Sequence, residues 1–333
     1  MRVFITGTAG FIGFHLARLL LAEGHEVAGF DGMTDYYDVR LKQRRHAILH
    51  QNPGFTATEA MLEDETALSA AVSAFAPDVI VHLAAQAGVR YSLENPRAYV
   101  DANVVGTLNV MQAARAAGVR HLLMASTSSV YGAGEDMPFV ETQKADTPLT
   151  IYAATKKANE AMGHAWAHIH DLPVTMFRFF TVYGPWGRPD MAYFKFTGAI
   201  LEGRPIDVYN NGEMWRDFTC VDDLVRAIRL LIDAVPGGPE TAVAGDSLSP
   251  AAPFRVVNIG NSDSVRLLDF IDAIEAATGR PAIRNHMPMQ TGDVRATWAD
   301  ATLLQTLTGY RPATPVREGL RRFVDWYREY YDI

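Results

Sequence analysis

At 333 residues, of which 48% are hydrophobic, the chain can bury a large core and fold as one large domain or two closely packed ones. A net charge of -8 argues against a nucleic acid or an anionic membrane as a partner, and no apolar stretch approaches the roughly 18 residues of a membrane span. Cys220 is the one cysteine, which excludes an internal disulfide and a cysteine metal cluster, so we expect a cytoplasmic protein without a signal peptide.

The N-terminal residues have the pattern of a strand, a glycine turn and a helix. An apolar run leads into Gly7, Gly10 and Gly13, and leucines at helical spacing follow. The glycine spacing differs from the commoner G-x-G-x-x-G, but its effect is the same, because no side chain blocks a pyrophosphate and helix N–H groups point at it. The turn therefore predicts a dinucleotide site that includes these glycines together with Phe11 and Ile12.

A second strand, over residues 26–30, ends at Asp31. This aspartate lies 24 positions after Gly7, about where such folds hydrogen-bond the adenosine ribose. Its carboxylate would repel a 2′-phosphate. The residue therefore favours NAD over NADP as the cofactor.

Further apolar runs alternate with helical segments along the first half of the chain. They span residues 78–83, 121–126 and 174–179. This alternation predicts an α/β protein with a Rossmann-type, doubly wound parallel sheet. Small or polar residues follow each run, and ligands bind at the carboxyl ends of such strands, so we expect these loops to line one site.

Tyr152 and Lys156 are four residues apart, which places a phenol and an ammonium on the same face of a helix. A tyrosine with a pKa of about 10 is a poor base, but nearby lysine and nicotinamide cations favour the phenolate. Such pairs also occur on ordinary solvated helix faces, so the pair gains its meaning from the predicted cofactor site. Thr127 follows a predicted strand and can share a substrate contact with Tyr152.

The second half of the chain has a different pattern, with glycine, proline and asparagine punctuation and an apolar run over residues 255–259. This pattern predicts a second, smaller domain that binds the substrate and covers the sheet, which we call the cap. We assign residues 1–180 mainly to the Rossmann domain, to which later segments return, and residues 181–333 mainly to the cap. Residues 234–254 lack apolar periodicity and predict a mobile surface loop. His164 and His168 fit an ordinary helix face, so no metal site is expected.

Several strings together resemble the extended short-chain dehydrogenases/reductases that act on nucleotide sugars. They are residues 7–13, 82–86, 152–156 and 216–218. Within that family, residues 87–96 and 178–191 are similar to UDP-glucuronate 4-epimerases, and the likeness covers nearly the whole chain. The resemblance implies NAD as cofactor, a UDP-sugar as substrate, and a homodimer. The candidate dimer helices are at residues 103–117 and 153–170, although burial inside a monomer would explain their apolar faces equally well.

The resemblance also implies roles for individual residues. Thr127, Tyr152 and Lys156 form the catalytic set, and the cofactor is lined by Leu62, Leu83, Ala84, Ala85, Gln86 and Asn103. Arg188, Arg216 and Asp293 would hold the diphosphate or the uridine ribose. Ser128, Ser129, Thr181 and Arg90 would surround the sugar carboxylate, although the serines could instead cap backbone groups.

One departure concerns the adenine end of the cofactor site. Where the family has a Gly-Asp-Leu string, this chain has Ala60-Met61-Leu62. Met61 could pack on the adenine ring, or Glu63 or Asp64 could replace the missing carboxylate.

The implied reaction is NAD-dependent 4-epimerisation of UDP-glucuronate to UDP-galacturonate through a transient 4-keto intermediate. Nucleotide-sugar 4,6-dehydratases have an acidic pair after the threonine, whereas Thr127 here precedes two serines. UDP-glucuronate decarboxylase (UDP-xylose synthase) and UDP-glucose 4-epimerase stay open as alternatives. An NAD-binding regulatory protein is the alternative from outside the enzymes, because a fold does not guarantee chemistry.

Overall fold

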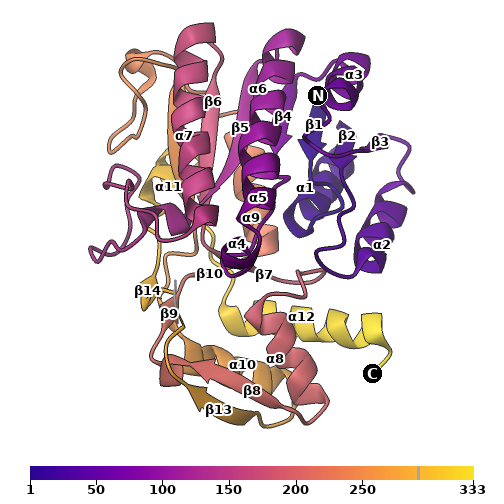
Figure 1. The fold of residues 1–333 in the computed structure, drawn as a ribbon, viewed down its shortest axis with the longest axis vertical. Helices are drawn as coiled ribbons and strands as arrows, with labels where there is room; N and C mark the ends of the chain where they lie inside the picture. The colour runs from indigo at the N-terminus through magenta and orange to yellow at the C-terminus, as the bar shows by residue number, and fades with distance from the viewer. Residues whose placement is uncertain (291–292) are drawn as a thin grey trace.

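The computed structural model describes residues 1–290 and 293–333 and has a seven-stranded, fully parallel sheet at its centre (Figure 1). The strand order is β11-β6-β5-β4-β1-β2-β3. The strands are β1 (Arg2–Thr6), β2 (Glu26–Asp31), β3 (Phe55–Glu59), β4 (Val79–His82), β5 (His121–Thr127), β6 (Val174–Phe179) and β11 (Phe254–Ile259). The predicted doubly wound parallel sheet is confirmed.

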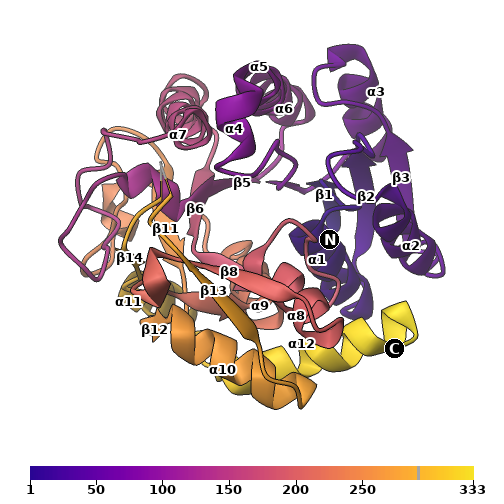
Figure 2. The same ribbon diagram turned by 60° about the horizontal axis from the view of Figure 1, so that its bottom comes forward.

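Helices cover both faces of this sheet (Figure 2). One face carries α3 (Glu65–Phe75), α6 (Gly106–Ala117) and α7 (Ile151–His170); the other carries α1 (Phe11–Ala22), α9 (Val221–Leu231) and α11 (Thr302–Thr308), with α2 (Val39–Leu49) beside α1. Strands β4, β5 and β6 are buried along their whole length, because helices exclude water from both sides. Most of their residues are accordingly apolar, although β6 also buries Thr175 and Arg178.

Strand β1 lies between β2 and β4, and the order of the strands reverses there. The chain runs outward from β1 through β2 to β3, then crosses back to β4 and continues through β5 and β6. Loops after β1 and β4 therefore diverge and leave a crevice at the carboxyl edge.

The cap is built from short strands and three helices below that edge in Figure 1. It contains β8 (Pro205–Tyr209) paired with β13 (Ile283–Met287), β9 (Trp215–Arg216) between β12 (Val265–Arg266) and β14 (Ala296–Thr297), and helices α8 (Ala192–Leu201), α10 (Leu267–Thr278) and α12 (Val316–Tyr331). β7 (Thr181–Tyr183) and β10 (Phe218–Cys220) pair between the cap and the main sheet. The aromatic core of the cap includes Phe218 stacked on Phe270, with ring centroids 3.7 Å apart.

Shorter helical segments complete the chain. They are α4 (Tyr91–Glu94), α5 (Pro96–Tyr99), η1 (Val100–Val105), η2 (Ser128–Tyr131), η3 (Asn210–Gly212) and η4 (Pro239–Thr241). The helix expected over residues 103–117 begins within the π-helix η1, and that expected over 153–170 begins two residues earlier.

Two expectations for the second half of the chain need correction. The run 255–259 belongs to β11, which pairs with β6 at the edge of the main sheet and not with the cap. The irregular segment 234–254 is fastened at several points: Asp246 pairs with Arg255, both 3% exposed, and the His164 Nε2 lies 2.8 Å from the Ser249 hydroxyl. His168 contacts the Ala251 carbonyl, so His164 and His168 of α7 both hold this loop.

Among residues 1–290 and 293–333, no three histidine, cysteine or acidic side chains are grouped to hold a metal ion. Over the same residues, none of the helices combines the length and the apolar composition that a membrane crossing requires.

Candidate active site

A cavity of about 1260 Å³ opens at the carboxyl edge of the main sheet and is lined by both the sheet and the cap. With one exception, all residues assigned to a site from the sequence line it. The assigned residues that line it are Gly7, Gly10, Phe11, Ile12, Gly13, Asp31, Leu62, Leu83, Ala84, Ala85, Gln86, Arg90, Thr127, Ser128, Ser129, Tyr152, Lys156, Thr181, Arg188, Arg216 and Asp293. The exception is Asn103.

The glycine turn after β1 has no room for side chains. Gly7 has φ +84°, and a Cβ there would lie 2.8 Å from the Ala84 nitrogen. A Cβ on Gly13 would lie 2.1 Å from the Gly7 carbonyl oxygen. Gly10 is the N-cap of α1, so unpaired helix N–H groups face the cavity beside a bare backbone. These residues fit the pyrophosphate of a dinucleotide.

Asp31 lies at the end of β2 and organises the turn as well as facing the cavity. Its Oδ2 accepts a hydrogen bond from the Ala9 nitrogen at 2.9 Å, and its Oδ1 accepts one from the Met33 nitrogen, also at 2.9 Å. A carboxylate oxygen can accept a second bond. The side chain can therefore hold the backbone and a ribose hydroxyl at once.

Thr127, Tyr152 and Lys156 come together at the centre of the cavity. Thr127 is the last residue of β5, and the other two occupy the first turns of α7, whose N-terminus is capped by the Thr150 side chain. The Lys156 Nζ donates to the Ala125 carbonyl at 3.0 Å, and burial lowers the pKa of this amine to about 8.

Burial raises the pKa of the Tyr152 phenol, whereas its polar contact with Thr127 and the charge of Arg188 act in the opposite direction. Desolvation thus disfavours the phenolate in the protein alone. A positive charge brought in with a bound ligand would favour it.

Asn103 lies behind the cavity wall and is not among the residues that line the cavity, so its assignment to the cofactor site stays a prediction. The side chain is fully buried, and its Oδ1 accepts from the Gln86 nitrogen at 2.8 Å. Its Nδ2 donates to the Gln86 carbonyl at 3.0 Å and to the Thr155 hydroxyl at 3.1 Å. Asn103 therefore ties the loop after β4 to α7, two elements that do line the cavity.

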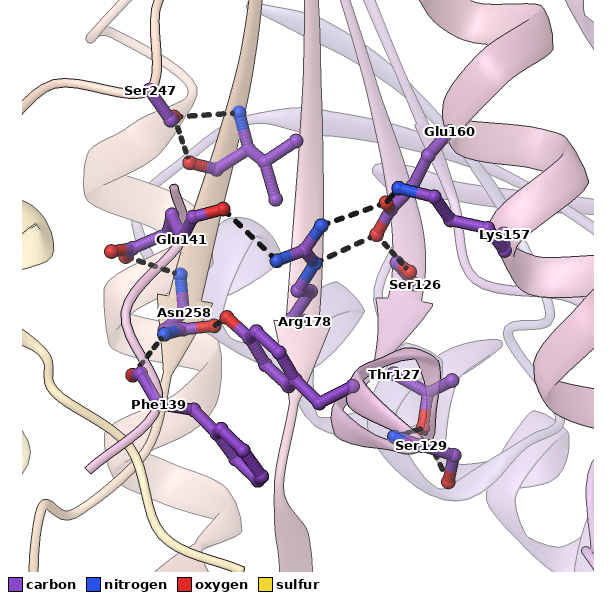
Figure 3. Close-up of polar contacts among 12 residues, drawn as sticks. Ser126, Thr127, Ser129, Phe139, Glu141, Lys157, Glu160, Arg178, Ser247 and Asn258 are labelled. Atoms are coloured by element: carbon purple, nitrogen blue, oxygen red, sulfur yellow. Dashed lines mark hydrogen bonds and ion pairs between the residues drawn. The ribbon is translucent and has the colours of Figure 1, made fainter. Parts of the chain in front are cut away.

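Ser128, Ser129 and Thr181 present hydroxyls to the cavity next to Thr127. Thr127, and neither serine, caps the turn that follows: its Oγ1 accepts from the Ser129 nitrogen at 3.2 Å, and it donates to the Ser129 hydroxyl at 3.3 Å (Figure 3). Within the described part of the chain, neither serine hydroxyl accepts from a backbone N–H or donates to a backbone carbonyl. The alternative role of the serines as caps is therefore not what the geometry shows.

Two of the arginines that line the cavity, Arg188 and Arg216, are each paired with an aspartate. The Arg188 Nε donates to Asp190 at 3.0 Å, and Tyr36 donates to the same carboxylate at 3.4 Å. The Arg216 Nη2 donates to Asp293 at 2.7 Å. The sequence did not single out Asp190 or Tyr36. Asp190 lies two residues after Arg188 in a string that the resemblance covers, whereas Tyr36 gave no local signal.

Arg90, in the loop after β4, is exposed at the rim of the cavity. Its guanidinium lies over the ring of Tyr209 from β8, 5.1 Å from the centroid. This contact joins the sheet domain to the cap across the opening.

At the adenine end, Met61 is 42% exposed and lines the cavity. Asp64 does not line the cavity, and its carboxylate caps α3 through the Ala67 nitrogen at 2.9 Å. Glu63 lines the cavity, and one of its carboxylate oxygens is buried without a partner in the described structure. Of the alternatives left by the sequence, Met61 and Glu63 fit and Asp64 does not.

A buried ionic network supports the catalytic helix from behind (Figure 3). Glu160 on α7 accepts two hydrogen bonds from Arg178 on β6, each 2.9 Å long, and both side chains are 3% exposed. The Ser126 hydroxyl donates to Glu160 at 2.7 Å, and Ser126 directly precedes Thr127. Arg178 also donates to the Glu141 carbonyl at 3.1 Å. The network fixes α7 against the strand that carries Thr127.

A glycine turn at the switch point of a parallel sheet, a buried tyrosine–lysine pair and a cap with paired arginines define a nicotinamide-dependent enzyme for a large anionic substrate. The chain belongs to the NAD dependent epimerase/dehydratase family, whose model matches residues 3–245.

Within this family, the chain is most usefully compared with three relatives. The chain is 58% identical to a probable UDP-glucuronate 4-epimerase of Rhizobium meliloti over 335 aligned positions, which cover 99% of this chain and 98% of that protein. It is similar in structure to UDP-glucuronic acid 4-epimerase of Bacillus cereus in complex with UDP-glucuronic acid and NAD, with a TM-score of 0.88, 31% identity and coverage of 99% and 100% of the two chains. UDP-glucose 4-epimerase of Thermotoga maritima with UDP-glucose reaches a TM-score of 0.86 at 27% identity, with coverage of 99% and 100%. The fold alone therefore does not separate glucuronate from glucose.

Proposed function

We propose that the protein is an NAD-dependent UDP-glucuronate 4-epimerase that interconverts UDP-glucuronate and UDP-galacturonate. The observation that carries the proposal is one cavity in which Thr127, Tyr152 and Lys156 lie beside the hydroxyls of Ser128, Ser129 and Thr181. The first three are suited to oxidation at a sugar carbon. The hydroxyls of Ser128, Ser129 and Thr181 are suited to bind the sugar carboxylate, whose carbon is two bonds from the oxidised carbon.

Bound NAD would accept a hydride from C4 of the sugar and return it. Tyr152 would take the proton from the 4-hydroxyl and later give it back to the 4-keto oxygen, while Thr127 hydrogen-bonds the same oxygen. The Lys156 Nζ is held 3.0 Å from the Ala125 carbonyl and lines the cavity together with Tyr152; in the proposed mechanism its ammonium favours the phenolate.

Inversion requires the 4-keto sugar to turn and present its other face. Arg188 and Arg216 would hold the UDP part meanwhile, because charge-assisted bonds to a diphosphate stay intact as the sugar rotates. Both arginines line the cavity together with Tyr152 and Lys156, but in the proposed roles they contact the diphosphate or the uridine ribose and not the sugar ring. Tight binding is thus separated from freedom at the reacting carbon.

Turnover of UDP-glucuronate by the purified protein tests the proposal. We expect UDP-galacturonate without carbon dioxide, and NAD that stays with the protein through purification, because the closed redox cycle needs no exchange. Carbon dioxide with UDP-xylose would instead identify a decarboxylase. Equal turnover of UDP-glucose would identify a UDP-glucose 4-epimerase, and bound NAD without any turnover would indicate a regulatory protein.

Replacing Ser128 and Thr181 together with alanine tests the carboxylate site. The carboxylate is beta to the 4-keto carbon and leaves as carbon dioxide when its bond aligns with the carbonyl π system, so donors must hold it out of alignment. Each lost bond to a charged group costs roughly 1.5 to 3 kcal/mol. The variant should prefer UDP-glucuronate over UDP-glucose less strongly and release more carbon dioxide per turnover.

Carbon dioxide and UDP-galacturonate are measured in one reaction. Thr219→Ala is the matched control, because its hydroxyl is buried on Asp217 and not on the cavity wall. An unaltered product ratio together with unaltered substrate preference would assign the carboxylate to other groups.

We also infer a cytoplasmic homodimer. Val105 and Leu108 on η1 and α6, and Ile151 and Ile169 on α7, are large apolar side chains left exposed on neighbouring helices. Figure 2 shows α6 and α7 on the same outer face. Pairing of this face with its copy would bury them. A monomer in light scattering at micromolar concentration would contradict the dimer.

A further inference from the structure

Arg45 on α2 is a fully buried cation without an acidic partner among the described residues. Its Nη1 donates to the Ala9 carbonyl at 2.7 Å and to the Tyr37 hydroxyl at 2.8 Å. Its Nη2 donates to the Trp186 carbonyl at 2.5 Å and to the Gly187 carbonyl at 3.2 Å. A buried charge is costly unless polar groups surround it. Here carbonyls of two distant segments do so, and both segments border the cavity.

The first segment is the cofactor turn. Ala9 lies between Gly7 and Gly10; its nitrogen donates to Asp31, and its carbonyl accepts from Arg45. The turn is therefore held from two sides, by a carboxylate on β2 and by a guanidinium on α2. Removing Arg45 would free one side.

The second segment leads to Arg188. The Pro185 carbonyl accepts from the His15 Nε2 at 2.8 Å, and burial lowers the pKa of His15 to about 3, so the ring is neutral with its proton on that nitrogen. Trp186 has φ +59°, which is uncommon for a residue with a side chain. Helices α1 and α2 thus hold three successive carbonyls, and the next residue is Arg188 on the cavity wall.

We propose that Arg45 is a positioning residue that couples the cofactor turn to the segment presenting Arg188, so that one buried side chain sets both ligand sites. The inference rests on the proposed function in one respect, namely that Arg188 contacts UDP-glucuronate. Arg45 does not line the cavity and acts through the backbone of its two partners.

A double-mutant cycle tests the coupling. Arg45→Met, Arg188→Met and the double variant are made in a Tyr152→Phe background, and UDP-glucuronate is titrated into the NAD-loaded protein without turnover. Arg188→Met should weaken binding roughly 10-fold or more. Arg45→Met should weaken it roughly 5- to 150-fold, the range of typical couplings. Both substitutions remove the same contact, that of Arg188 with UDP-glucuronate. The double variant should therefore bind UDP-glucuronate no more weakly than the single variant with the lower affinity.

NAD release on dilution is the second measurement, and Arg45→Met should lose NAD faster than its parent. Arg44→Met is the matched control, since Arg44 is the exposed neighbour of Arg45 on α2. This substitution should change neither the release of NAD nor the affinity for UDP-glucuronate. Arg45→Lys keeps a buried cation without the two-armed fork. Its UDP-glucuronate affinity and its rate of NAD release should lie between those of the parent and of Arg45→Met. Arg45→Lys replaces Arg45→Met in the test if the methionine variant does not fold.

Additive losses in the cycle would overturn the proposal, because Arg45 would then not act through Arg188. Unaltered affinity in Arg188→Met, or in a folded Arg45→Lys, would overturn it as well. Non-additive binding of UDP-glucuronate in the cycle, together with no UDP-galacturonate from the parent protein that keeps Tyr152, would instead support the coupling and refute the proposed function.

Discussion

Tyr152→Phe is expected to lower kcat for UDP-glucuronate by about 10²- to 10⁴-fold, because the variant keeps the ring and removes the hydroxyl that carries the proton. The ring packs at 6.1 Å from Tyr99, centroid to centroid, and a phenylalanine preserves that contact. Binding of UDP and retention of NAD should therefore change little.

Initial rates and a UDP titration check this expectation on the same preparation. Tyr331→Phe is the control, since Tyr331 is 41% exposed at the end of α12 and far from the cavity walls. Full activity in Tyr152→Phe would remove the phenol from the mechanism. A large loss of UDP affinity would mean that Tyr152 contributes to binding and not mainly to proton transfer.

Glu160→Leu is expected to lower the free energy of unfolding by about 3–5 kcal/mol, the cost of leaving a buried charge without its partner. Arg178 is 3% exposed and would keep only the Glu141 carbonyl as an acceptor. Replacing both partners, in Glu160→Leu with Arg178→Met, should recover much of the loss, because no fully buried charge is then left unpaired. Lys157, which also pairs with Glu160, is 34% exposed and can be solvated.

Urea unfolding measures these differences. Asp325→Asn is the control: it breaks the Arg321–Asp325 pair, whose side chains are more than half exposed, and should change stability by no more than about 1 kcal/mol. A loss of that small size in Glu160→Leu would show that the network does not hold α7.

The loss in the free energy of unfolding caused by Glu160→Leu should depend on pH. Burial raises the pKa of Glu160, but hydrogen bonds and charge from Arg178 outweigh it, and the net pKa lies below the ordinary 4.5. The stabilisation is therefore complete above that pH and is lost as the pH falls through the lowered pKa. The difference between the parent and Glu160→Leu should narrow in acid.

Several features of this protein follow from short stretches of sequence. The glycine turn, the strand ending at Asp31 and the strands at 174–179 and 121–126 match the structure within one residue. Each depends on neighbours in the chain: glycines that leave no room for a Cβ, or apolar runs buried on both faces of a sheet. The helical spacing of Tyr152 and Lys156 is local in the same way.

Other features depend on residues far apart in the chain, and only the tertiary structure decides them. Strand β11 reads like the other apolar runs, but its place beside β6 follows from pairing across about 80 residues of chain, as the register of Phe254 with Val174 shows. Asn103 resembles a cofactor contact, whereas its burial behind Gln86 is set by where α7 packs.

Charged side chains show the difference most clearly. In the sequence, Arg45 and Arg178 look like any other arginines, because burial and partners are not local properties. The fold buries both and surrounds one with carbonyls and the other with Glu160. The residue types and spacing of the reacting groups were thus readable from the sequence. The side chains that hold those groups in place became visible only when distant strands and helices were brought together, because a buried charge is stabilised by whatever surrounds it in space.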